Sequence, residues 1–310
     1  MLGPFGALQF KFVVEVGIAE VSGEALAAEF ERVLVDLVDL VDLVDLVDLV
    51  DPAPPEAGVA TLSVERTGRG RGRAWCLRVR EGREGSAART AFAAADDAYV
   101  VSQVLREINS SAIRTVDCEV VLHGAALSHE GSAIVVAGAS HAGKSTLAAA
   151  LTLAGWRYLS DDVAPVRVGP SGDFVVLRYP KPIMLRPASM ARFAGCLPAA
   201  SPSAAEFVRY ERPEPASSFG RVGADTRLGA IVILDALGAN PLSPGAAVLE
   251  LARACHAKTD EVGMSRSQLA QLGAIATAIP VVAMIRPDLS TAASAAAASD
   301  RLASIVHSRR

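Results

Sequence analysis

The sequence lacks the closely spaced cysteines that metal and redox sites use. Four cysteines stand alone, at Cys76, Cys118, Cys196 and Cys255, and none of them forms a C-x-x-C pair. Isolated cysteines of this kind usually behave as small buried hydrophobes in a reducing compartment. We therefore expect no disulfide framework and no cysteine-based metal site.

A strong excess of either charge is also missing. The net charge is -4 at pH 7 and the isoelectric point is near 5.8. This balance gives no electrostatic reason to expect nucleic acid or an anionic membrane as a partner. One basic stretch, GRGRGR at 68–73, has no aromatic residue between its arginines for base stacking, so we interpret it as a hairpin turn.

Long hydrophobic runs and targeting signals are lacking as well. The N-terminal stretch has no basic n-region, and Glu15 interrupts its apolar run, which argues against a secretory signal. The run AIATAIPVVAMI near the end of the chain is too short to span a bilayer and contains Pro280. The sequence thus predicts a cytoplasmic protein.

What the chain does have is ample apolar material for a core. Of 310 residues, 51% are hydrophobic and 21% are charged, which suits one large domain or two ordinary ones. Residues 1–114 predict a smaller β-rich accessory region. Within it QFKFVVEVGIAEV is typical of a strand, ATLSVER and AWCLRVR predict a hairpin, and Asp96 to Ile113 has helical spacing. The apolar side of that helix is expected to comprise Val100, Val104, Leu105 and Ile108.

An insert at 34–51 repeats Leu-Val-Asp six times. A period of three keeps the aspartates neither on one face of a helix nor on one face of a strand. We interpret the insert as a low-complexity extension of the preceding helix, with an adhesive or partner-binding segment as the alternative. The proline cluster that follows, at 52–55, ends any helix there.

Residues 115–310 predict an α/β domain with a mixed sheet. The segments CEVVLHGAALSHE, SAIVVAG, WRYLSDDVAPV, DFVVLRYP, KPIMLRP and GAIVILDA are typical of strands. A helix is expected to follow the second of them through Leu153, and two more are expected at Arg266 to Ala278 and Ser290 to Val306. Strand and helix therefore alternate on both sides of the most informative motif of the chain.

That motif is GASHAGKST, which matches the phosphate-binding loop G-x-x-x-x-G-K-[ST]. Its glycines allow consecutive N–H groups to turn toward a phosphate, and the following helix adds the positive end of its dipole. Lys144 can reach the β- and γ-phosphates, and the hydroxyl of Ser145, rather than that of Thr146, can join the shell of Mg²⁺. The predicted nucleotide-binding residues are Gly138, Ala139, Ser140, His141, Ala142, Gly143, Lys144, Ser145 and Thr146.

Acidic residues at two strand ends are candidates for the magnesium side of such a site. An NTPase would use Asp235, which ends an apolar strand, whereas a kinase would use the pair Asp161 and Asp162. Two adjacent carboxylates can divide the work, one supporting the metal and the other accepting the proton of an attacking hydroxyl. His123, on the strand before the loop strand, could hydrogen-bond one of these carboxylates and set its protonation.

In its order of motifs, the region 115–240 resembles the HPr kinase/phosphorylase family and related kinases. The likeness rests on a strand with His123, the loop with Lys144 and Ser145, and a strand that ends in Asp161 and Asp162. It implies a fold similar to phosphoenolpyruvate carboxykinase and phosphorylation of a serine hydroxyl on a protein with ATP and Mg²⁺. By this resemblance Asp162 accepts the proton, Asp161 and His123 support it, and Ser145 and Asp161 bind the metal. A looser match places Arg227 near the transferring phosphate.

The chain departs from the family at two places. His141 stands where the loop usually has glycine, and no match is found for the glutamate signature of the bifunctional enzymes. The resemblance therefore points to divergent kinases with a protein or peptide acceptor, including precursor peptides of natural products. The alternatives are a P-loop NTPase switch and a nucleotide sensor that has lost its chemistry. A homo-oligomer is compatible with the sequence.

Overall fold

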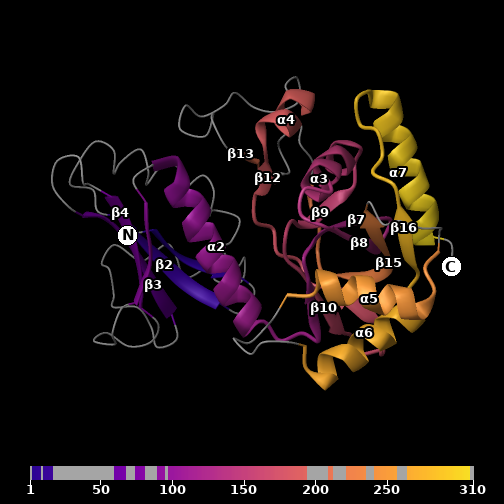
Figure 1. The fold of residues 1–310 in the computed structure, drawn as a ribbon, viewed down its shortest axis with the longest axis horizontal. Coiled ribbons are helices and arrows are strands. Elements are labelled where there is room, and N and C mark those ends of the chain that lie inside the picture. Colours follow the sequence, from indigo (N-terminus) through magenta and orange to yellow (C-terminus); the bar gives the residue numbers. More distant parts are fainter. Residues whose placement is uncertain are drawn as a thin grey trace. The chain divides into compact units, whose positions relative to one another are not determined.

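The computed structural model describes residues 2–7, 10–16, 59–67, 74–80, 89–94, 97–193, 209–211, 221–234, 241–256 and 264–307. The Leu-Val-Asp insert at 34–51, the basic stretch at 68–73, Cys196 and Asp235 lie outside these residues. The chain divides into two compact units, Met1–Val116 and Asp117–Arg310 (Figure 1).

In its described part, the first unit is a five-stranded sheet in chain order, accompanied by one long helix. Strands β2 and β3 pair in parallel and the other neighbours are antiparallel, including the expected pair β3 and β4. All four residues predicted for the apolar side of the helix are buried. The elements are β1 Leu2–Ala7, β2 Phe10–Val16, β3 Val59–Thr67, β4 Ala74–Arg80, β5 Arg89–Ala94 and α2 Asp97–Thr115.

The second unit contains a mixed sheet of nine strands in the described residues, and the fold is α/β, as the sequence predicts. The strand order is β14-β9-β7-β8-β15-β11-β10-β6, and β16 pairs with β15. The strands are β6 Val120–Leu122, β7 Gly124–His129, β8 Ser132–Gly138, β9 Arg157–Ser160, β10 Ala164–Val168, β11 Phe174–Val176, β14 Arg221–Val222, β15 Thr226–Leu234 and β16 Val281–Met284. A separate pair comprises β12 Ile183–Leu185 and β13 Arg209–Glu211.

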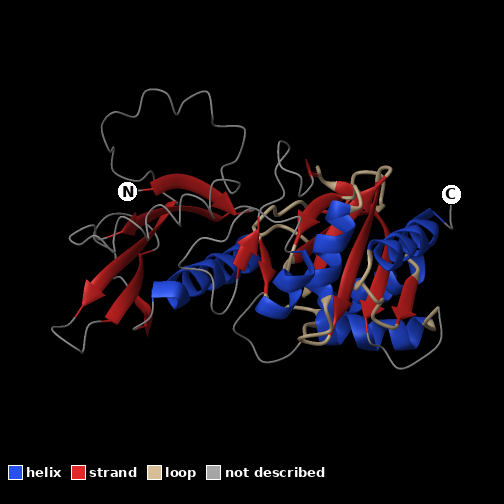
Figure 2. Cartoon of the chain, turned by 90° about the horizontal axis from the view of Figure 1, so that it is seen from above, coloured by secondary structure: helices blue, strands red, loops and turns tan. Residues whose placement is uncertain are grey.

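Helices cover both faces of the sheet in this unit (Figures 1 and 2). Alternation along β8 separates the two layers: Ile134 and Val136 pack with α3 and α7, whereas Val135 packs with α5 and α6. Period-two alternation of fully apolar strands is what a sheet buried on both faces requires. The helices are α3 Lys144–Leu153, α4 Pro187–Met190 with the short 3-10 helix Ala191–Phe193, α5 Pro244–Ala254, α6 Arg266–Ala278 and α7 Ala292–His307.

Local sequence explains where two of these helices begin. Ser265 caps α6 and exchanges hydrogen bonds with Gln268, which is a complete capping box. Ser243 caps α5, and Pro244 occupies its first position, where the missing N–H costs nothing. Helix α6 has the predicted bounds, while α5 and strand β16 were not predicted from the sequence.

Two predicted strands are each divided in the structure. His123 is not in a strand: it occupies a bend between β6, which pairs with β10, and β7, which pairs with β8 and β9. Similarly, WRYLSDDVAPV forms β9 and β10, with Asp161 and Asp162 in the turn between them. Both breaks let a strand leave one neighbour for another, a change of partner that periodicity along the chain does not reveal.

The parallel register of β8 and β15 fixes the position of the predicted phosphate loop. Gly138 pairs with Leu234 at the carboxyl ends of these strands, the edge at which α/β sheets place their ligands. A Cβ atom on Gly138 would lie 2.9 Å from the Leu234 carbonyl oxygen, so only glycine allows this close approach. Within the described residues, none of the helices combines the length and apolar character needed to cross a bilayer.

Two leucines of α5 provide a test of this packing. Leu251 is fully buried against the sheet, whereas Leu249 is 63% exposed. We expect Leu251→Ala to lower the free energy of unfolding by about 2–5 kcal/mol and Leu249→Ala to change it by less than about 0.5 kcal/mol. Chemical denaturation of both variants measures this, and helix propensity cancels because the same change is made in the same helix. Equal losses would contradict the described orientation of α5.

Candidate active site

The predicted phosphate loop, GASHAGKST, joins the end of β8 to the start of α3. Gly143 caps the helix with a φ of 99°, and His141 also has a positive φ, of 68°. The Ala142 N–H donates to the Ala139 carbonyl at 3.2 Å, which closes the loop on itself. Left-handed conformations at glycine cost little, but at histidine they are uncommon, so the loop has some strain at His141.

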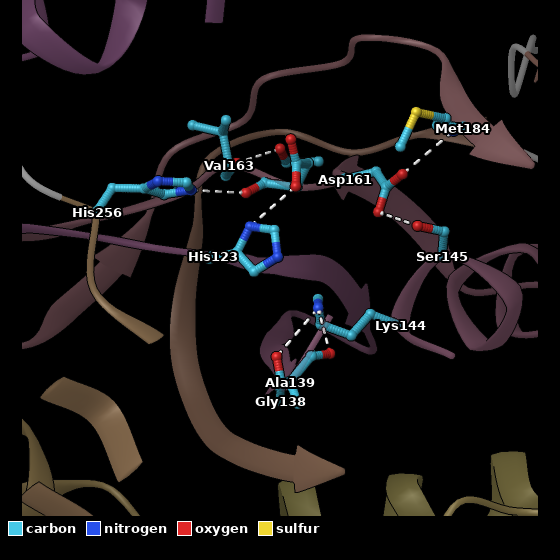
Figure 3. A network of polar contacts seen from close by, with 11 residues as sticks. His123, Gly138, Ala139, Lys144, Ser145, Asp161, Val163, Met184 and His256 are labelled. Carbon is cyan, nitrogen blue, oxygen red and sulfur yellow. Dashed lines mark hydrogen bonds and ion pairs between the residues drawn. The ribbon is translucent and has the colours of Figure 1, made fainter. Parts of the chain in front are cut away.

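Lys144 is buried at the first position of α3. Its Nζ atom donates to the carbonyl oxygens of Gly138 and Ala139, each at 3.0 Å (Figure 3). Burial lowers the pKa of Lys144, and the nearby carboxylates of Asp162 and Asp161 act in the opposite direction. The ammonium group thus lies directly over the loop, where it can balance the charge of a phosphate.

Asp161 is the most deeply buried acid of the site, with 1% of its surface exposed. Its carboxylate accepts hydrogen bonds from the Ser145 hydroxyl at 3.0 Å and from the Met184 N–H at 3.2 Å (Figure 3). Burial raises the pKa of Asp161, and the positive charge of Lys181 acts to lower it. The residues predicted to share a magnesium ion, Ser145 and Asp161, are therefore in direct contact.

Asp162 faces a different environment from its neighbour. Its Oδ1 atom accepts a hydrogen bond from His123 Nδ1 at 2.9 Å, and its backbone carbonyl accepts one from His256 Nε2 at 3.1 Å. Burial alone would raise the pKa of Asp162, but the hydrogen bond from His123 and the charge of Lys181 outweigh it, so the pKa lies well below its usual range. Asp162 also has a positive φ of 72°, which aspartate tolerates better than most residues.

His256 is a site residue that sequence reasoning missed. The segment after α5 pairs with β6, where the His256 N–H donates to Val121 and the His123 N–H donates to Ala254. This pairing brings the rings of His123 and His256 to a centroid distance of 5.2 Å in an edge-to-face arrangement. The contact spans more than a hundred residues, so no local motif could have indicated it.

Three basic residues near the loop or the two aspartates were also missed. Lys181 is 3% exposed, and its charge acts on both aspartates. Arg186 Nη1 contacts His141 Nδ1 at 2.5 Å, and a Cβ atom on Gly143 would lie 2.9 Å from Arg286 Cδ. A lysine in an otherwise apolar strand segment, KPIML, was the one available signal for Lys181.

The remaining predicted residues have distinct positions. His141 and Ser140 are exposed. Thr146 Oγ1 shares a hydrogen bond with Ser189 Oγ at 2.7 Å, which is compatible with the prediction that Ser145, rather than Thr146, binds the metal. Arg227 lies at the start of β15, opposite Val175 and 4.0 Å from the Asp173 carboxylate. Seven residue steps along β15, about 23 Å, separate it from Leu234, so the structure does not bring Arg227 to the predicted phosphate loop.

No protein family and no curated protein matches the chain. Among solved structures it is similar to the Hpr(Ser) kinase/phosphatase from Coxiella burnetii, with 14% sequence identity and a TM-score of 0.29. The match covers 59% of this chain and 97% of that one. A likeness at this level carries no argument about chemistry, so the function must be inferred from the side chains.

The two aspartates should affect stability in opposite directions. In its folded state Asp161 holds a proton more tightly than in the unfolded chain, so its contribution is greatest at low pH and is lost as pH rises through the folded pKa. For Asp162, whose folded pKa is depressed, the contribution is present above the unfolded pKa and is lost as pH falls. In EDTA at pH 8 we expect Asp161→Asn to raise the Tm and Asp162→Asn to lower it.

An asparagine at 161 can accept from the Met184 N–H and donate to Ser145, whose hydroxyl can reverse, so both hydrogen bonds are kept. Asp162 still opposes the charge of the buried Lys181. Differential scanning calorimetry of the two single variants from pH 4 to pH 8 measures the effect. A lower Tm for Asp161→Asn at pH 8 would show that folding favours the charged form of Asp161 after all.

Proposed function

We propose that this chain is an ATP-dependent kinase that transfers the γ-phosphoryl group to a hydroxyl, preferably a serine, of a protein or peptide. The observation that carries the proposal is the contrast between Asp161 and Asp162, two adjacent acids with different partners and opposite pKa shifts beside the predicted phosphate loop. One carboxylate is buried against Ser145, and the other is held ionised by His123. A hydrolase that activates water needs only one such acid, whereas a kinase can use both.

The donor set next to the loop suits magnesium. Ser145 and Asp161 offer a hydroxyl and a carboxylate oxygen 3.0 Å apart, and Mg²⁺ prefers oxygen ligands of this kind. Both residues would hold the ion together with the phosphates of the nucleotide. When bound, Mg²⁺ supplies positive charge to the phosphate oxygens.

The transfer is a single in-line displacement. The acceptor hydroxyl oxygen forms a bond to the γ-phosphorus while the bond from phosphorus to the β,γ-bridging oxygen breaks, and ADP leaves with that oxygen. Asp162 takes the proton of the acceptor hydroxyl. Lys144 balances charge on the phosphoryl oxygens, and the rigid placement of these groups supplies most of the acceleration.

A depressed pKa is compatible with this role for Asp162. It keeps the carboxylate ionised, and therefore able to accept a proton, throughout the neutral range. A loose transition state has little bonding to the attacking oxygen, so a weak base suffices. The side chains of Asp162 and His123 are 33% and 36% exposed, which leaves them open to an acceptor presented from solvent, as a serine on a peptide would be.

The alternatives make different use of the same residues. An NTPase switch would hydrolyse ATP without an acceptor and would depend on another acid. The sequence candidate for that acid, Asp235, lies outside the described residues. A sensor without chemistry would bind nucleotide and never turn it over. The positive φ of His141 and its contact with Arg186 are the features that would favour the sensor hypothesis.

Asp162→Asn and Lys144→Ala separate binding from chemistry. With γ-labelled ATP, Mg²⁺ and a panel of serine peptides, we expect Asp162→Asn to reduce transfer by at least about 100-fold with little change in ATP affinity. Lys144→Ala should weaken both affinity and transfer, because its ammonium lies on the loop. Asp300→Asn, an exposed change on α7, is the matched control and should leave both unchanged.

Two results would overturn the kinase assignment. Phosphate release that needs no acceptor and is unchanged in Asp162→Asn would indicate an NTPase. Tight ATP binding with no turnover for any acceptor would indicate a sensor.

Lys181 allows a second test of the site. Because its charge favours the ionised form of Asp161, Lys181→Met should reduce transfer by at least about tenfold, or 1.4 kcal/mol in the barrier. The loss should be larger at pH 6 than at pH 8, since Asp161 then carries a proton more of the time. Lys181→Arg restores the charge and should recover part of the rate, with circular dichroism as the check on folding. A pH-independent loss that arginine does not rescue would assign Lys181 a packing role only.

A further inference from the structure

Outside the phosphate site, three metal-ligating side chains converge where α7 ends against the turn between β7 and β8. They are His129, Glu130 and His307, and one ligand atom of each lies within 4.8 Å of the other two. His129 Nδ1 is 3.4 Å from His307 Nε2, and His307 Nε2 is 3.6 Å from the Glu130 carboxylate. We propose that these residues form a binding site for a divalent transition metal, with Zn²⁺ as the ion they fit.

The separations favour a shared ion over direct hydrogen bonds. Ordinary N–H contacts to nitrogen or oxygen are about 2.7–3.2 Å long, shorter than either distance here. In a tetrahedral zinc site with bonds of about 2.0–2.1 Å, neighbouring ligand atoms lie about 3.4 Å apart. The distances from His307 Nε2 to His129 Nδ1 and to the Glu130 carboxylate, 3.4 and 3.6 Å, match that spacing within a few tenths of an ångström. Two imidazoles and a carboxylate are also a donor set that zinc selects and magnesium does not.

The turn that presents His129 and Glu130 has a fixed shape. His129 pairs with Ser132 across a two-residue hairpin, and Glu130 and Gly131 both have positive φ, of 46° and 79°. Such a turn is the standard two-residue connection between antiparallel strands. The His129 ring also lies against the buried Trp156 ring at 4.9 Å, which holds the imidazole on the side of α7.

Packing fixes the other partner, His307, at the last residue of α7. Leu302 and Val306 are buried in the core, and the Trp156 indole donates to Ser299 of the same helix at 2.9 Å. A Cβ atom on Gly229 would lie 3.2 Å from the Val306 carbonyl, so the end of α7 sits directly on β15. The ligands therefore come from two elements that are already held in place.

This site is independent of the proposed kinase chemistry. His129 and Ser132 mark one end of the β7 and β8 hairpin, and Gly138 marks the other, about 20 Å away along β8. An ion here would join the end of α7 to the hairpin turn and stabilise the folded domain. Three protein ligands leave one position for water, and Glu130 is 66% exposed, so we expect micromolar affinity and not the tight binding of a closed site.

The test is a titration of the full chain with Zn²⁺ in excess Mg²⁺, followed by calorimetry and thermal unfolding. We expect about one zinc ion per chain and a rise in Tm of about 5 °C at saturation. Co²⁺ in place of Zn²⁺ should show the strong visible absorption of a tetrahedral site. His307→Gln should abolish both signals. Glu130→Gln, a change of nearly equal size at a side chain that is 66% exposed, should weaken zinc binding by about 10-fold or more.

His123→Asn is the matched control, since it removes a histidine from elsewhere and should leave zinc binding and the zinc-induced rise in Tm unchanged. Zinc binding of equal affinity in His307→Gln and in the unmodified chain would overturn the proposal. So would an absence of any zinc-dependent change in Tm.

Discussion

A buried carboxylate, Asp161, connects the parts of the candidate active site. It accepts hydrogen bonds from Ser145 in α3 and from the backbone of Met184 in β12, and it is influenced by the charge of the buried Lys181. Together with Asp161 itself, these groups come from three segments of the second unit: α3, the turn after β9, and the segment that leads into β12. A buried carboxylate is costly unless it is hydrogen-bonded and opposed by positive charge. The positions of the loop helix and β12 beside the turn that follows β9 therefore depend on one another.

The neighbouring residue shows how strongly position decides protonation. Asp161 and Asp162 are adjacent in sequence, and burial acts to raise the pKa of both. At Asp161 burial prevails, whereas at Asp162 the hydrogen bond from His123 and nearby positive charge outweigh it. Groups whose environments move their pKa values apart are typical of sites that divide acid and base roles. The folded state tolerates the unfavourable environment of Asp161 because the surrounding sheet and helices bury a large apolar core. Asp161 therefore lowers the folding stability when it is ionised, and the rest of the domain compensates for this loss.

Parts of this arrangement follow from the sequence. The loop motif, its preceding strand and its following helix were identified from residue types and spacing, and so was the placement of Asp161 and Asp162 after a strand. Arg227 lies far from the loop along β15, and a resemblance in chain order could not show which end of a parallel strand it occupies. His123 was assigned to a strand because the residues on both sides of the break between β6 and β7 are apolar, so the hydrophobic pattern does not reveal the break. His256, Lys181 and the cluster of His129, Glu130 and His307 could not be found, since their partners lie far away along the chain.

By itself, the sequence determined where a loop with a phosphate-binding motif lies, between a buried strand and an apolar helix, because that motif is built from consecutive residues and needs glycine at fixed positions. It also determined the α/β class, since alternating patterns of strand and helix record which faces are buried. The tertiary structure alone decided which side chains oppose one another across the site and what protonation each prefers. Those properties depend on burial and on distances between segments, and neither is encoded in local spacing.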